Sequence, residues 1–148
     1  MINEYKKFVN SSAHFENKRI QVGSEYKHQN ILSLKSFKLA NKEISSWDKY
    51  EPTPLYYLSD LAKYSGVSSI AYKDENLRFS LKSFKALGGA YAVANLLIKK
   101  LKEIGIEANS SDLIAGTYID LTSKITVCCA TDGNHGRSVA WGAQKFGC

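Results

Sequence analysis

Residues 81–91 read LKSFKALGGAY and place a lysine at the start of a predicted helix. Ser83 is a favourable N-cap, and apolar residues recur at helical spacing from residue 84 to about residue 103. Lys85 therefore lies in the first turn, at the positive end of the helix dipole, where an ammonium ion is disfavoured. We expect the pKa of this amine to fall and its nucleophilic fraction to rise, so that Lys85 can form a Schiff base with an aldehyde.

Two adjacent glycines interrupt this helix. Inside a helix, Gly88 and Gly89 each cost about 1 kcal/mol relative to alanine, so something is expected to approach the backbone closely there. A tight crossing with another helix or strand and the approach of a ligand explain the pair equally well.

The second motif is a glycine-rich turn between a strand and a helix. Residues 125–130, ITVCCA, are typical of a buried parallel strand, and a helix is predicted from about residue 137 to residue 146 with Val139, Ala143 and Phe146 on one face. Such units place functional loops at the carboxyl end of a parallel sheet.

The turn itself, residues 131–136, reads TDGNHG. Its glycines allow backbone N–H groups to face a ligand, and Asn134 and His135 add side-chain donors at a helix N-terminus. Because Asp, Gly and Asn are also ordinary turn residues, a ligand-binding turn and a purely structural turn are equally good interpretations of the spacing.

The remaining patterns predict shorter elements. They are helices at residues 34–42, 58–64 and 112–118, strands at residues 67–73 and around residues 19–22, and an extended stretch at residues 50–55 that holds both prolines. The order of elements predicts an α/β fold with a parallel sheet and flanking helices. We expect residues 1–50 to form an N-terminal extension and residues 51–148 to form the organised region.

Composition excludes several classes of protein. At 148 residues and 44% hydrophobic content, the chain is expected to form one folded domain. The net charge of +6 comes from scattered lysines, and the one cluster, Lys99, Lys100 and Lys102, is better explained as the solvated face of a helix than as a nucleic-acid patch. The sequence shows neither a signal peptide nor a stretch long enough to span a membrane.

The three cysteines fit neither a disulfide framework nor, with the scattered histidines, a metal site. Cys128 and Cys129 are expected to be buried in the apolar strand, and a reducing, cytoplasmic setting is the simplest interpretation. The chain stops at Gly147 and Cys148, where an αβ pattern would enter its next strand, so we expect a truncated product.

Four motifs together resemble the fold type II pyridoxal phosphate enzymes, the family that includes threonine deaminase and tryptophan synthase β. They are Pro52-Thr53-Pro54-Leu55, Lys73-Asp74-Glu75, Ser83-Phe84-Lys85 and Gly133-Asn134-His135. The resemblance covers residues 50–148. Within the family, the runs at residues 84–92 and 131–137 are most similar to the diaminopropionate ammonia-lyases.

The resemblance implies that Lys85 binds pyridoxal 5'-phosphate through its amine and that Asn134 donates a hydrogen bond to the phenolic oxygen of the ring. It further implies that Asp132 removes the α-proton of a D-substrate, with Lys85 serving the L-substrate; Asp132 could equally bind the second ammonium group of the substrate. The implied reaction converts 2,3-diaminopropionate to pyruvate and ammonia, in a full-length enzyme that is a homodimer. His135 is expected to shape the loop rather than to transfer protons.

Two alternatives remain open at the level of the sequence. One is a deaminase of serine or threonine, which the aspartate at position 132 disfavours because those enzymes carry a small residue there. The other is a non-catalytic fragment that needs a separate C-terminal half, because the family's phosphate-binding glycine loop lies in a portion that this sequence does not contain.

Overall fold

The computed structural model describes residues 18, 28, 31–131 and 133–148. The chain divides into two compact units, Met1–Ser33 and Leu34–Cys148, and the fold below is that of the second unit. The strand predicted around residues 19–22 and the predicted base Asp132 both lie outside the described residues.

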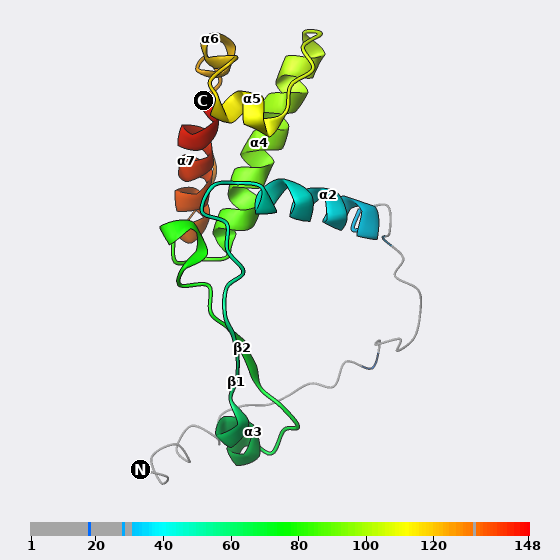
Figure 1. Cartoon of the computed structure of the whole chain (residues 1–148), viewed down its shortest axis with the longest axis vertical. Coiled ribbons are helices and arrows are strands. Elements are labelled where there is room, and N and C mark those ends of the chain that lie inside the picture. The colour runs from blue at the N-terminus through cyan, green and yellow to red at the C-terminus, as the bar shows by residue number, and fades with distance from the viewer. Residues whose placement is uncertain (1–17, 19–27, 29–30, 132) are drawn as a thin grey trace. The chain divides into compact units, whose positions relative to one another are not determined.

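Two long helices, α4 (Lys85–Glu103) and α7 (Asn134–Phe146), lie side by side and form the centre of the second unit (Figure 1). α4 confirms the predicted helix. α7 begins three residues earlier than predicted, because Gly133 adopts a φ of 155° that turns the chain directly into the helix.

The face of α7 that meets α4 is built from small residues. The buried positions of α7 are Ser138, Gly142 and Phe146. Phe146 is therefore buried as predicted and Val139 packs half-buried against the core, but the closest contact with α4 involves Ser138 and Gly142, which were not predicted. A Cβ atom on Gly142 would lie 2.7 Å from the Cα of Ala90, which shows that the two helix backbones nearly touch. Because small side chains permit this approach, the contact line runs through Ser138 and Gly142 rather than through the larger Val139.

The same crossing explains one glycine of α4. A Cβ on Gly89 would lie 2.3 Å from the Oγ of Ser138, whereas a Cβ on Gly88 would meet nothing within 4 Å. The close approach that the glycine pair predicted is therefore a helix crossing at Gly89, whereas Gly88 is exposed.

A cluster of aromatic rings forms part of the core next to α7. Trp47 lies with its ring centroid 5.5 Å from Phe146 and 6.0 Å from Phe79, and Phe79 lies 4.9 Å from Trp141. Tyr50 extends the cluster at 6.1 Å from Phe79. These rings join the end of α7 to the segment that precedes α4.

The second unit contains one described sheet, a two-stranded antiparallel pair of β1 (Leu55–Tyr57) and β2 (Ala71–Lys73) (Figure 1). The predicted strand at residues 67–73 is thus confirmed only in its last three residues. Between the strands lies α3 (Ser59–Ser65), which ends at Gly66 in the left-handed conformation.

The other helices are short or lie outside the core. α2 (Leu34–Ser45) extends three residues beyond its prediction and has no buried residue. The 3-10 turn η2 (Arg78–Ser80) precedes α4, and the single helix predicted at residues 112–118 is instead the pair α5 (Ser110–Ile114) and α6 (Ile119–Thr122).

Residues 125–130 do not form the predicted strand. They have no regular secondary structure, and their side chains alternate between half-buried positions such as Ile125 and Val127 and exposed ones such as Cys128. A strand requires a ladder of hydrogen bonds to a neighbour, and no neighbouring strand pairs with this segment in the part of the chain that the structure describes. The prediction that Cys128 is buried was wrong for the same reason, whereas Cys129 is half-buried.

Candidate active site

Lys85 is the first residue of α4, and its side chain is exposed. The N-cap position is Phe84, one residue later than predicted. The Oγ of Ser83 nevertheless accepts a hydrogen bond from the backbone N–H of Lys85 at 3.2 Å. The Nζ atom lies 5.0 Å from the centroid of the Phe84 ring. The backbone of Lys85 is therefore held by Ser83, whereas its side chain is exposed and accessible to a ligand.

The turn before Lys85 has an unusual backbone. Phe79, Ser80 and Lys82 have positive φ values of 47°, 59° and 56°. Each such residue costs about 1–2 kcal/mol, because its Cβ comes close to the next carbonyl oxygen. The strain is offset by burial of Phe79, which is 6% exposed in the aromatic cluster. The cluster thus holds a tight turn directly ahead of the lysine.

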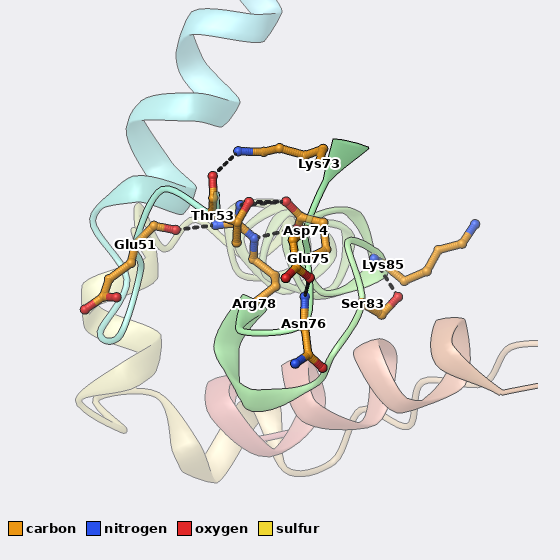
Figure 2. A network of polar contacts seen from close by, with 9 residues as sticks. All are labelled: Glu51, Thr53, Lys73, Asp74, Glu75, Asn76, Arg78, Ser83 and Lys85. Carbon is orange, nitrogen blue, oxygen red and sulfur yellow. Dashed lines mark hydrogen bonds and ion pairs between the residues drawn. The ribbon is translucent and has the colours of Figure 1, made fainter. Parts of the chain in front are cut away.

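A polar network centred on the buried Arg78 also holds this turn (Figure 2). The guanidinium of Arg78 donates to both carboxylate oxygens of Glu75, at 2.8 and 3.1 Å, to the Oγ1 of Thr53 at 3.1 Å and to the carbonyl of Glu51 at 2.8 Å. Thr53 also donates to Glu75, and Lys73 donates to the carbonyl of Thr53. The network therefore joins the proline-containing stretch to the loop that leads to Lys85.

The charges in this network stabilise one another. The hydrogen bond from Arg78 lowers the pKa of Glu75 below its ordinary value, with a smaller contribution from the Thr53 hydroxyl, while burial acts in the opposite direction. The same bond raises the pKa of Arg78. The guanidinium also lies 5.3 Å from the centroid of the Tyr50 ring, where the π face favours a cation.

The glycine turn is organised by Thr131, which the sequence did not single out. Its Oγ1 accepts hydrogen bonds from the N–H of Gly133 at 3.1 Å and of Gly136 at 2.8 Å. A Cβ on Gly136 would lie 2.3 Å from the Cγ2 of Thr131. The amides of both glycines therefore donate to Thr131, and the glycine at position 136 makes room for its side chain.

The lysine and the glycine turn line one hollow. Its volume is about 460 Å³, and its lining residues are Ser83, Phe84, Lys85, Gly133, Asn134 and His135. A neighbouring hollow of about 560 Å³ shares Ser83, Phe84 and Asn134 and extends over the loop at residues 72–76. The structure thus brings Lys85 and Asn134, 49 positions apart in the sequence, to the same place.

Other features lie away from this place. A third hollow, of about 240 Å³, lies beside α3 and contains none of the predicted site residues. Among the described residues there is no group of histidine, cysteine or acidic side chains suited to a metal ion, and none of the described helices is long and apolar enough to cross a membrane.

A family model described as pyridoxal-phosphate dependent enzyme matches residues 47–148. The diaminopropionate ammonia-lyase of Escherichia coli K12 is 44% identical over 117 residues, which are 79% of this chain and 28% of the relative. The diaminopropionate ammonia-lyase of Salmonella typhimurium LT2 is 45% identical over 101 residues, 66% of this chain and 24% of the relative. The chain thus spans about 28% of the length of the first of these relatives.

Solved structures give the same result. The holo diaminopropionate ammonia lyase from Escherichia coli matches with a TM-score of 0.58 and 39% identity, over 78% of this chain and 28% of that one. The same enzyme in complex with an aminoacrylate-PLP azomethine reaction intermediate matches with a TM-score of 0.55 and 37% identity, over 78% and 27%. The match confirms the α/β, fold type II expectation for the chain.

Proposed function

The chain belongs to the pyridoxal-phosphate dependent enzymes, and from this premise we propose that it supplies the cofactor-binding lysine of a diaminopropionate ammonia-lyase. One observation supports the proposal most strongly: Lys85 and Asn134 line a single hollow. The relative from Escherichia coli K12 and the solved holo structure from Escherichia coli both bear that enzyme's name.

The residues of the hollow fit pyridoxal phosphate. The cofactor presents an aldehyde and a phenolic oxygen, and the hollow offers an exposed primary amine in Lys85 and a side-chain amide donor in Asn134. The amide can stabilise an oxygen anion without adding a charge. When bound, the cofactor withdraws electron density from the α-carbon of an amino acid, which makes the α-proton more acidic.

The protein's own residues then have distinct tasks. Lys85 binds the cofactor and accepts the α-proton of an L-substrate, and Asp132 accepts the α-proton of a D-substrate or binds the second ammonium group. Breaking the α C–H and β C–N bonds forms a carbon–carbon double bond and releases ammonia. Addition of one water then gives pyruvate and a second ammonia, so 2,3-diaminopropionate and one water account for all product atoms.

The same proposal includes the setting of the enzyme. We assign residues 51–148 to the catalytic region and residues 1–50 to an extension, and we expect a cytoplasmic homodimer when the enzyme is complete. We propose a small-molecule amino acid as the binding partner, and neither nucleic acid nor a membrane as a partner.

The substrate is tested by measuring pyruvate formation from D- and L-2,3-diaminopropionate, serine and threonine in the presence of pyridoxal phosphate. In an enzyme completed with the remaining length of a relative, we expect activity with diaminopropionate only. In that enzyme Asp132→Asn should reduce activity with the D-enantiomer by about 10²-fold or more while retaining most activity with the L-enantiomer. Preferential turnover of serine or threonine would favour the deaminase alternative. Pyruvate formation that appears only after addition of the remaining length of a relative would identify this chain as one part of the enzyme.

A further inference from the structure

We propose that Ser138 is a positioning residue for Lys85, an inference that rests on the proposed role of Lys85 as the cofactor lysine. Ser138 lies in the second turn of α7 and is 1% exposed. Its Oγ donates to the backbone carbonyl of Lys85 at 2.6 Å, across 53 positions of sequence. The hydroxyl thus contacts the residue that carries the amine.

The bond restrains the backbone of Lys85 rather than its side chain. In an α-helix the carbonyl of residue i accepts from the amide of residue i+4, so the Lys85 carbonyl faces the Gly89 amide and keeps a second lone pair for Ser138. The Ser83 hydroxyl accepts from the Lys85 amide on the other side. Both polar groups of the Lys85 backbone are therefore held by serine side chains, which fixes the point from which the long side chain starts.

The packing around Ser138 fixes the position of α7 along α4 at which the hydrogen bond from Ser138 to Lys85 can form. The Ser138 Oγ occupies the space in which a Cβ on Gly89 would lie, at 2.3 Å from that position. One turn further along α7, Gly142 meets Ala90 with a similarly close approach. Sliding α7 by one residue would replace Ser138 with the larger Val139 and lose the hydroxyl donor.

The bond also connects the two sides of the hollow. Asn134 and Ser138 are four residues apart in α7, so they lie on the same face of the helix. Holding the Lys85 carbonyl on Ser138 therefore fixes the start of α4 relative to the start of α7, where Asn134 lies. We infer that Ser138 sets the separation between the amine of Lys85 and the amide of Asn134.

The test compares Ser138→Ala with Thr122→Val in the full chain. Thr122 is a matched control, because it is also 1% exposed and its hydroxyl also donates to a backbone carbonyl, that of Tyr118 at 3.2 Å, but it has no contact with α4 among the hydrogen bonds described. Each protein is treated with pyridoxal phosphate and cyanoborohydride, and the labelling rate of Lys85 is divided by that of the exposed Lys99. Amide hydrogen exchange of residues 86–89 is measured on the same samples without the cofactor.

We expect Ser138→Ala to lower the Lys85 to Lys99 labelling ratio about three- to tenfold and to increase exchange at residues 86–89, since one buried hydrogen bond is lost. Thr122→Val should change neither the labelling ratio nor the exchange at residues 86–89, even if it lowers the unfolding midpoint as much as Ser138→Ala does. Equal labelling ratios and equal exchange in the two variants would overturn the inference, because Ser138 would then act through packing alone.

The two readouts separate this inference from the proposed function. If Lys85 of the unaltered chain is labelled no faster than Lys99, the proposed function fails, and hydrogen exchange alone decides whether Ser138 holds the start of α4. If Ser138→Ala does not fold, Ser138→Cys replaces it. A thiol is a weaker donor, so a lower labelling ratio and faster exchange than in the unaltered chain support the inference, and an unchanged ratio and exchange contradict it.

Discussion

Gly88 and Gly89 are adjacent, yet the structure gives them opposite roles. Gly89→Ala places a Cβ 2.3 Å from the Oγ and 2.8 Å from the Cβ of Ser138, so the helices must separate. We expect the free energy of unfolding to fall by about 1–3 kcal/mol, as for other overpacked cores. Urea denaturation monitored by circular dichroism measures this change.

Gly88→Ala is the matched control on the same helix. A Cβ on Gly88 meets nothing within 4 Å, so the change should raise the free energy of unfolding by about 0.5–1 kcal/mol through helix propensity. Equal effects of the two substitutions would contradict the assigned crossing of α4 and α7.

Single residues also show what the sequence could and could not predict at the site. Lys85 and Asn134 were identified because each lies in a long motif at the start of a helix. Thr131 and Ser138 were missed because a hydroxyl has no signature until its partner is known, and the partners of both are backbone groups. Their only signal was indirect: the glycines at positions 136 and 89 leave room for these two side chains.

At the scale of elements, the turn before α4 depends on the pair formed by Arg78 and Glu75. Because Arg78 lowers the pKa of Glu75 in the folded chain, the carboxylate contributes stability above its ordinary pKa of 4.5. That contribution is lost as the pH falls through the lower, folded-state pKa. We expect the free energy of unfolding to decrease between about pH 5 and about pH 3 in urea titrations.

Glu75→Gln should remove much of this pH dependence and should also destabilise the chain at neutral pH, by about 1–3 kcal/mol, because the buried guanidinium of Arg78 loses its charged hydrogen-bond partner. Glu103→Gln is the control. Glu103 also has a lowered pKa, through Lys100, but it is exposed, and water and salt screen that pair. A similar loss of pH dependence in both variants would rule out the Glu75 pair as its source.

The sequence predicted best those helices whose apolar face is buried against another part of this chain. α4 and α7 have apolar or small faces that bury each other, so pattern and structure agree. Residues 125–130 have the composition of a buried strand, but hydrogen-bond pairing depends on a neighbour that a local pattern does not specify. The positive φ values at Phe79, Ser80 and Lys82 were also missed, because the aromatic cluster and the Arg78 network that hold them are formed by distant segments.

At the scale of the whole molecule, the described unit brings together motifs that are scattered along the sequence. The proline-containing stretch and the loop at residues 73–78 meet in the Arg78 network, and Lys85 and Asn134 meet at the hollow. The family and its α/β class followed from these motifs, and the match over residues 47–148 confirms them. The chain covers about 28% of the length of its relative from Escherichia coli K12, so the activity of a complete enzyme stays a prediction.

The central claim, that Lys85 is the residue that binds pyridoxal phosphate, is tested most directly by locating the attached cofactor. The full chain is mixed with pyridoxal phosphate, reduced with borohydride, digested and mapped by mass spectrometry, alongside Lys85→Ala and the same-helix control Lys99→Ala. We predict that the cofactor is attached predominantly at Lys85 in the unaltered chain and in Lys99→Ala, and that Lys85→Ala shows only weak, scattered labelling. Labelling spread evenly over the exposed lysines of the unaltered chain would contradict the account.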